Sequence, residues 1–196
     1  MIRLAIVLLA SVLALGLVAC GPQKPQFNNT DITGADYGKA LQLADQTGKV
    51  RTLADFKGSA VLVFFGFTQC PDVCPTTLAE MKAVKTLLGE DGKRFQVLFV
   101  TVDPERDTAE LLGQYMAAFD PAFLGLRGDA EATAKVAKDF KVFYQKVPGS
   151  TPDTYSMDHS AGSYIFDPQG RLRLYVRHGQ PADKIAADIK RLLAGN

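Results

Sequence analysis

Two cysteines lie where the sequence changes from the pattern of a strand to the pattern of a helix. The run Val61–Phe67, VLVFFGF, is apolar and rich in β-branched and aromatic residues, which is typical of a buried strand. Cys70 and Cys74 follow it, and each is followed by a proline. Because a residue before proline disfavours the right-handed helical conformation, we expect both cysteines in the loop or in the first turn of the next helix.

Thiols at a helix start differ chemically from thiols in a core. The unpaired backbone N–H groups and the helix dipole favour the thiolate, which is both a metal ligand and a nucleophile. Thr77 and Glu80 fit a capping box, so the regular helix is predicted to begin between Pro75 and Leu78 and to run to about Leu88.

The alternative for Cys70 and Cys74 is a structural disulfide. In the chain-entropy model a loop of about five residues gains only about 2 kcal/mol, against about 4.7 kcal/mol for a loop of about 100 residues. Such a short disulfide would add little to the stability of the fold, so we favour redox or metal chemistry as the role of the two cysteines.

The first 19 residues have the layout of a secretory signal peptide. A short basic start at Arg3 precedes an apolar run that ends in small residues. The next residue, Cys20, completes the string LVAC, which resembles a bacterial lipoprotein processing site and would make Cys20 the lipidated first residue of the mature chain. The alternative is an uncleaved membrane anchor, since the apolar run is nearly long enough to span a bilayer. Both interpretations tether the protein to a membrane.

The cysteine count has a consequence if Cys20 carries lipid. The chain has three cysteines, so Cys70 and Cys74 would then remain as an isolated pair. Exported proteins meet an oxidising environment, so a function that needs thiolates requires a reducing partner or prompt capture of a metal.

Composition indicates one domain without a nucleic-acid partner. A chain of 196 residues with 47% hydrophobic residues suits a single globular domain, predicted over residues 39–196. Residues 20–38 are rich in Gly, Pro, Asn and Asp and are predicted to form a tether, whose end could pack on the domain through Phe27, Ile32 and Tyr37. The 22 basic and 21 acidic residues nearly balance, so no basic face for nucleic acid is implied.

The order of the remaining elements predicts an α/β fold. An early hairpin precedes a strand–helix–strand unit, which implies two parallel strands joined by a crossover helix. Further helices, an antiparallel hairpin and a closing helix then give a mixed sheet flanked by helices, with the early hairpin added at the N-terminus. The predicted segments are a hairpin over 41–53, strands 61–67 and 95–102, helices 107–119, 129–140 and 182–193, and a hairpin of 164–166 with 172–176; Asp107 and Glu110 fit the cap of the second helix.

With paired cysteines after its first central strand, this arrangement resembles a thioredoxin-like fold. Two features depart from that fold. The spacing is Cys-x-x-x-Cys where thioredoxins have Cys-x-x-Cys, and residues 156–160, ahead of the late hairpin, lack the proline that thioredoxins place opposite their cysteines.

Histidine supplies the third candidate ligand. Of two histidines, His159 lies in a predicted loop that the fold would bring beside the cysteines, whereas His178 is predicted to be a surface residue. Two thiolates and one imidazole form a soft, low-coordinate set that suits copper, especially Cu(I). The alternatives are a His159 that makes only ordinary hydrogen bonds, or zinc, which normally takes four protein ligands where three can be named. Met157 is expected to pack beneath the loop rather than to add its thioether.

Three segments carry a family resemblance: FTQCPDVCPTTL, TVDPERDT and DHSAGSYIFDPQG, in this order. From about Asp31 to the C-terminal helix the chain resembles the Sco/SenC proteins, membrane-tethered copper proteins concerned with assembling the CuA centre of cytochrome c oxidase. The resemblance implies that Cys70, Cys74 and His159 bind copper as Cu(I) or Cu(II). It also implies that Asp103 lies near the copper and orients His159 or tunes the charge of the ligands, the alternative being a carboxylate that caps its own turn.

Two functions follow as hypotheses. The first is a copper-binding assembly factor rather than an enzyme, whose partner is the oxidase subunit that carries CuA. The second is a thiol-disulfide reductase that keeps the target's cysteines reduced, with one of Cys70 and Cys74 attacking and the other resolving the mixed disulfide. A peroxidase is disfavoured, because no single activated cysteine with an arginine partner stands out. Either function needs a thiol reductant, and the first needs a copper donor; the resemblance implies the periplasmic face of the inner membrane as the location.

Overall fold

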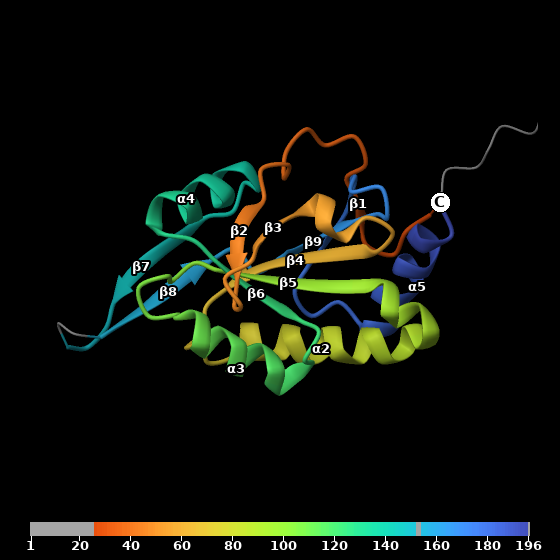
Figure 1. Ribbon diagram of the computed structural model, residues 1–196. Coiled ribbons are helices and arrows are strands. Elements are labelled where there is room, and N and C mark those ends of the chain that lie inside the picture. The colour runs from red at the N-terminus through yellow and green to blue at the C-terminus, as the bar shows by residue number, and fades with distance from the viewer. Residues whose placement is uncertain (1–25, 152–153, 196) are drawn as a thin grey trace, which may run out of the picture.

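The computed structural model describes residues 26–151 and 154–195 (Figure 1). The predicted signal segment 1–19 and the predicted lipidation site Cys20 lie outside the described residues. No helix in the described ranges combines the length and the apolar character that crossing a membrane requires.

A sheet of eight strands forms the centre of the molecule, in the order β1-β10-β9-β4-β5-β6-β2-β3. The strand β4 pairs in parallel with β5, and β5 with β6, while the other pairs are antiparallel. This mixed sheet flanked by helices confirms the predicted α/β architecture. The elements are β1 (Thr30–Asp31), β2 (Gln42–Asp45), β3 (Val50–Thr52), β4 (Ala60–Gly66), α2 (Val73–Leu88), β5 (Phe95–Thr101), α3 (Ala109–Phe119), β6 (Leu124–Arg127), α4 (Ala130–Asp139), β7 (Tyr144–Pro148), β8 (Tyr155–His159), β9 (Ser163–Phe166), β10 (Leu172–Val176) and α5 (Ala182–Leu193), with short 3-10 helices at Leu53–Phe56 and Gly89–Arg94.

The central strand β4 is buried on both faces because a core lies on each side of the sheet. Its alternate residues Ala60, Leu62 and Phe64 belong to a core built with α2, α3 and α5. The intervening side chains belong to a second core, to which α4 contributes. The two sets of helices accordingly lie on opposite sides of the sheet in Figure 1. A continuous apolar run is what such a strand requires.

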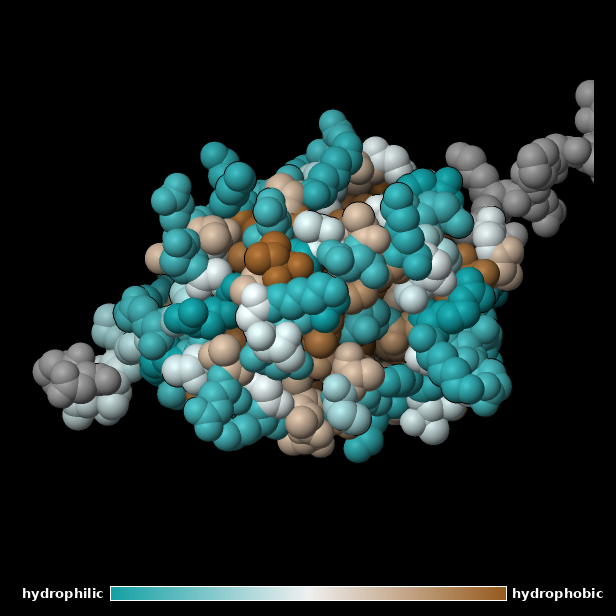
Figure 2. All heavy atoms as spheres, in the orientation of Figure 1, coloured by the Kyte–Doolittle hydropathy of each residue, from teal (hydrophilic) through white to brown (hydrophobic). Residues whose placement is uncertain are grey.

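The surface is mostly polar on the face shown in Figure 2, where hydrophobic side chains appear only in small separate patches. Among the described residues, the large hydrophobic side chains that are most exposed are Val50, Leu87 and Phe143. The apolar content of the chain is therefore largely used in the two cores.

The described start of the chain is fastened to the domain. Strand β1 pairs with β10, and the backbone N–H groups of Asn28 and Asn29 donate to the buried Asp188 carboxylate of α5 at 2.8–3.0 Å. The side-chain amides of both asparagines donate to the same carboxylate. Part of the segment predicted as a tether thus lies against α5, and Phe27 packs against the core beside it.

A second, two-stranded sheet formed by β7 and β8 was not predicted. Its strands pair antiparallel, with Tyr144 opposite His159 and Pro148 opposite Tyr155. This hairpin extends away from the main sheet in Figure 1. The prediction that His159 lies in a loop is wrong, because His159 is the last residue of β8.

Candidate metal centre

Both cysteines follow the carboxyl end of β4. Helix α2 begins at Val73, which is earlier than predicted, so Cys74 is its second residue and Cys70 lies in the loop before it. Both cysteines therefore lie in the loop or the first turn, as predicted. Cys74 is fully buried and Cys70 is partly exposed, and the backbone N–H of Cys74 donates to Cys70 Sγ at 3.4 Å. This hydrogen bond ties the Cys70 sulfur to the first turn of α2.

The proposed capping box does not form at this helix. The residue before α2 is Asp72, which makes no side-chain cap hydrogen bond. Thr77 instead lies within the helix, where its hydroxyl pairs with Nδ1 of the exposed His178 at 3.2 Å. His178 is on the surface, as predicted.

Gly66 makes room for the buried sulfur. A Cβ at this position would lie 2.7 Å from Cys74 Sγ and 2.7 Å from the ring of Phe99. Real Cβ atoms do not approach other heavy atoms so closely, so the last residue of β4 has to be glycine for the sulfur to stay where it is.

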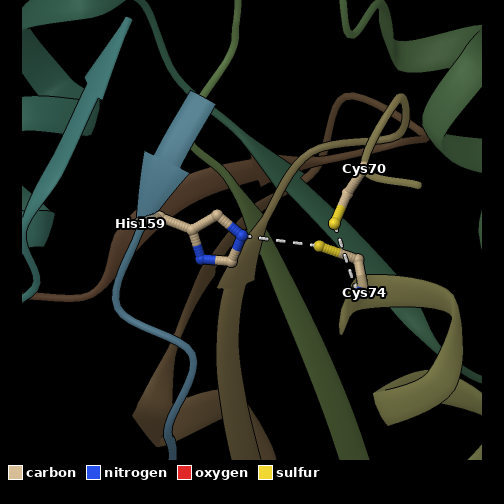
Figure 3. A group of neighbouring side chains, drawn as sticks. All are labelled: Cys70, Cys74 and His159. Carbon is tan, nitrogen blue, oxygen red and sulfur yellow. Dashed lines mark hydrogen bonds between the residues drawn. The ribbon is translucent and has the colours of Figure 1, made fainter. Parts of the chain in front are cut away.

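The imidazole of His159 points from the end of β8 toward the two cysteines (Figure 3). Its Nε2 lies 3.6 Å from Cys74 Sγ, although the two residues are 85 positions apart. The other ring nitrogen, Nδ1, lies 3.0 Å from the carbonyl oxygen of Ser160. A carbonyl oxygen can only accept, so Nδ1 carries the proton and the lone pair of Nε2 faces the sulfurs. The rings of Phe64 and Phe67 pack edge-on against the imidazole at 6.2 and 5.9 Å.

The three side chains fit a single metal ion. The sulfurs of Cys70 and Cys74 and a nitrogen of His159 all lie within 4.8 Å of one another, and this is the one group of three or more potential ligands found in the described ranges. With bond lengths of about 2.3 Å to sulfur and about 2.0 Å to nitrogen, as for zinc, ligands of one ion lie at most about 4.6 Å apart. The three ligand atoms would have to approach one another only slightly to bind one ion. Two sulfurs and one imidazole nitrogen form a soft donor set, which suits copper.

Protonation of the metal-free site differs from the expectation. Burial, followed by the neighbouring Cys70 thiol, raises the pKa of Cys74, so this sulfur is a thiol at neutral pH. The prediction that the helix start favours the thiolate is therefore wrong for Cys74, because burial outweighs the helix dipole. Burial lowers the pKa of His159, which keeps its ring neutral and able to act as a ligand.

Asp103 does not bond to the imidazole of His159, whose hydrogen-bond partners are Cys74 and Ser160. Its buried carboxylate accepts hydrogen bonds from the Tyr155 hydroxyl, at 2.8 Å, and from Nε of Arg106. Burial and the hydrogen bond to Asp103 raise the pKa of Tyr155 to about 12, so the hydroxyl keeps its proton at neutral pH. Asp103 thus touches β8, the strand that carries His159, near its start.

Asp107 has a role that the sequence did not indicate. It does not cap α3, whose N-cap is Thr108, and its fully buried carboxylate instead accepts from the Thr68 N–H at 3.1 Å and the Thr68 hydroxyl at 2.6 Å. The hydroxyl of Thr101 donates to it as well, at 2.5 Å. Asp107 therefore fastens the cysteine loop to the end of β5. The signal available in the sequence was that Asp107 is a second aspartate, after Asp103, in the turn that follows the buried strand β5.

Comparison with known proteins agrees with this geometry. The family model for SCO1/SenC matches residues 29–194. The chain belongs to the SCO1/SenC family.

Relatives within the SCO1/SenC family include mitochondrial and bacterial proteins. The chain is 40% identical over 156 residues to the bovine mitochondrial SCO2 homolog, covering 79% of this chain but only 59% of the bovine protein. It is 36% identical over 178 residues to a SCO2-like protein of Rickettsia felis, covering 89% of this chain and 85% of that protein.

Solved Sco structures share the fold. Copper-bound ScoI of Bradyrhizobium japonicum is 42% identical, with a TM-score of 0.71 over 78% of this chain and 96% of that one. Apo Sco1 of Thermus thermophilus is 39% identical, with a TM-score of 0.76 over 88% of this chain and 99% of that one. The predicted thioredoxin-like fold is confirmed by these similarities.

Proposed function

We propose that this protein is a membrane-tethered copper-binding protein that assists assembly of the CuA centre of cytochrome c oxidase. The observation that carries the proposal is the grouping of Cys70, Cys74 and His159 in a family with copper-bound members. A further Sco structure is described as a member of a family of cytochrome c oxidase assembly proteins. Copper is the cargo in this function, and the oxidase subunit that carries CuA is its destination.

The exposure of the ligands suits transfer. Cys70 and His159 are partly exposed, whereas Cys74 is fully buried. Incoming thiolates could therefore replace the two outer ligands first and the buried sulfur last. A copper donor must load the site, and a thiol reductant must keep both cysteines reduced, because an exported dithiol tends to oxidise.

The first test is copper binding by the reduced full-length chain. We expect one Cu(I) per chain with sulfur and nitrogen ligands, and a loss of affinity of at least about 100-fold in His159→Ala, measured by competition with a chelator. The matched control is His178→Ala, which removes the exposed second histidine and should leave the affinity unchanged. An unchanged affinity in His159→Ala would exclude the site.

A thiol-disulfide reductase is the second candidate, favoured by the unequal exposure of the two sulfurs. The accessible Cys70 would attack a disulfide of the target, and the buried Cys74 would resolve the mixed disulfide, which leaves the target reduced and this pair oxidised. Thiol exchange does not need His159. If His159→Ala still supports oxidase assembly while both Cys→Ser variants fail, the reductase is the main function.

Tethering belongs to the same proposal, with Cys20 lipidated after removal of residues 1–19 and the domain on the periplasmic face of the inner membrane. We expect Cys20→Ser to move from the membrane fraction to the soluble fraction, because it cannot be lipidated, if the signal segment is still cleaved. Immunoblots of both fractions measure this. Wild-type chain recovered from the membrane with residues 1–19 still present by mass spectrometry would indicate an uncleaved anchor instead.

A further inference from the structure

Arg106 connects the two segments that carry the candidate ligands. It lies in the turn after β5, and its Nη1 donates to Oε1 of Gln69 at 3.0 Å and to the backbone carbonyl of Tyr155 at 2.8 Å. Gln69 immediately precedes Cys70, and Tyr155 is the first residue of the strand that ends at His159. One guanidinium nitrogen thus bridges the cysteine loop and the histidine strand.

The packing around the guanidinium reinforces this bridge. Its central carbon lies 3.6 Å from the centre of the Tyr155 ring and 5.9 Å from that of Phe67, which in turn packs against His159. Nε of Arg106 pairs with one carboxylate oxygen of Asp103, whose other oxygen accepts from the Tyr155 hydroxyl. Arg106, Asp103 and Tyr155 therefore close a ring of contacts in which each group orients the next.

The hairpin that carries His159 needs such an attachment. Strands β7 and β8 form their own two-stranded sheet and are not hydrogen-bonded as strands to the eight-stranded sheet. An isolated hairpin is at best marginally stable in water. The distance from His159 to the cysteines consequently depends on side chains that hold the hairpin against the domain.

We propose that Arg106 is a positioning residue that sets the distance between His159 and the two cysteines. The proposal rests on the copper site proposed above and adds a determinant of its geometry that is not a ligand. Lysine cannot take over this role, because a single ammonium group lacks the planar fork that reaches Asp103, Gln69 and the Tyr155 carbonyl together. Arg106→Lys therefore keeps the charge and removes the bridge.

Arg51→Lys is the matched control. Arg51 also pairs through Nε with a buried aspartate, Asp45, at 2.7 Å. Its side chain is 21% exposed, against 20% for Arg106. Arg51 lies in the β2–β3 hairpin at the edge of the sheet. Any loss of stability that comes only from replacing a largely buried arginine should therefore appear equally in both variants.

The first measurement uses the reduced full-length chain without metal. We expect amide hydrogen exchange in residues 155–159 to rise about tenfold in Arg106→Lys and to stay at the wild-type rate in Arg51→Lys. Unchanged exchange in Arg106→Lys, or an equal rise in Arg51→Lys, would overturn the proposal. This measurement stands even if the chain does not bind copper, so it separates a failure of this proposal from a failure of the proposed function.

The second measurement is a double-mutant cycle in copper affinity. We expect Arg106→Lys to weaken binding about 10- to 100-fold, as for other residues that orient a metal ligand. In the His159→Ala background the same substitution should cost less than about threefold, because the imidazole that Arg106 positions is gone. An equal loss in both backgrounds would show that Arg106 acts on the cysteines or on the fold in general.

Discussion

Gly66→Ala is expected to weaken copper binding by at least about 100-fold. The added methyl group would lie 2.7 Å from Cys74 Sγ, so the sulfur has to leave the position in which it lies beside Cys70 and His159. Structural zinc sites gain about 10–16 kcal/mol from about four ligands, so one displaced ligand costs about 3 kcal/mol or about 100-fold. Overpacking should also lower the free energy of unfolding by about 1–3 kcal/mol. Chelator competition and urea unfolding measure the two effects.

Gly125→Ala is the control for overpacking without a metal ligand. Gly125 lies in β6 of the same sheet, and its added Cβ would lie 3.0 Å from Leu112 Cβ and 3.2 Å from Met116 Cγ. We expect lower stability with wild-type copper affinity. If Gly125→Ala loses copper to the same extent, the effect of Gly66→Ala is one of stability and not of ligand position.

Copper affinity of the reduced chain is expected to rise at least about tenfold for each pH unit from about pH 7 to 9. The raised pKa of Cys74 means that the metal-free protein holds a proton on this sulfur, which the metal must displace. Raising the pH therefore favours the bound state. The lowered pKa of His159 leaves its ring neutral over this range, so the imidazole adds nothing to the slope.

Cys74→Ser isolates the contribution of the buried thiol to this pH dependence. Because Cys74→Ser lacks the proton that copper displaces from this sulfur, its slope should be lower than that of wild type by about one decade per pH unit. Competition titrations, corrected for the protonation of the chelator, give both slopes. A wild-type affinity that does not change with pH would contradict a protonated Cys74.

Local patterns predicted much of the fold. The periodicity of the last helix gave the bounds of α5, Ala182–Leu193, and the turn signals gave the β2–β3 and β9–β10 hairpins. Among the strands that were missed, β6 pairs only with strands distant in sequence, and β7 and β8 are partly polar strands stabilised by each other. No local rule reports such pairing.

The start of α2 shows how a correct rule can be applied too strictly. The residue before a proline disfavours a helix, so the helix was predicted to start after Cys74. In the structure Pro75 is the third residue of α2, where its missing N–H would have had no partner within the helix. The first turn therefore accommodates both the proline and Cys74.

The candidate ligands could be named from the sequence, and the predicted fold brought His159 beside the cysteines, but in a loop and not at the end of a strand. Cys70 and Cys74 share one turn, whereas His159 reaches them through a hairpin that the sequence did not reveal. The assignment of His159 as the third ligand came from the family resemblance. Arg106 and Asp107 were missed as supports of the site, because their contacts join the turn after β5 to the cysteine loop and to β8, which are distant in sequence.

The fastening of Asn28 and Asn29 to Asp188 determines which end of the molecule would face the lipid. The described chain begins beside the C-terminal end of α5, whereas the ligands lie at the carboxyl end of β4, toward the hairpin side in Figure 1. If Cys20 is the anchor, the roughly six residues before Gln26 reach at most about 20 Å. The domain would then stand on its α5 end close to the bilayer and offer its metal outward, so a recipient has to receive copper in the aqueous space above the membrane.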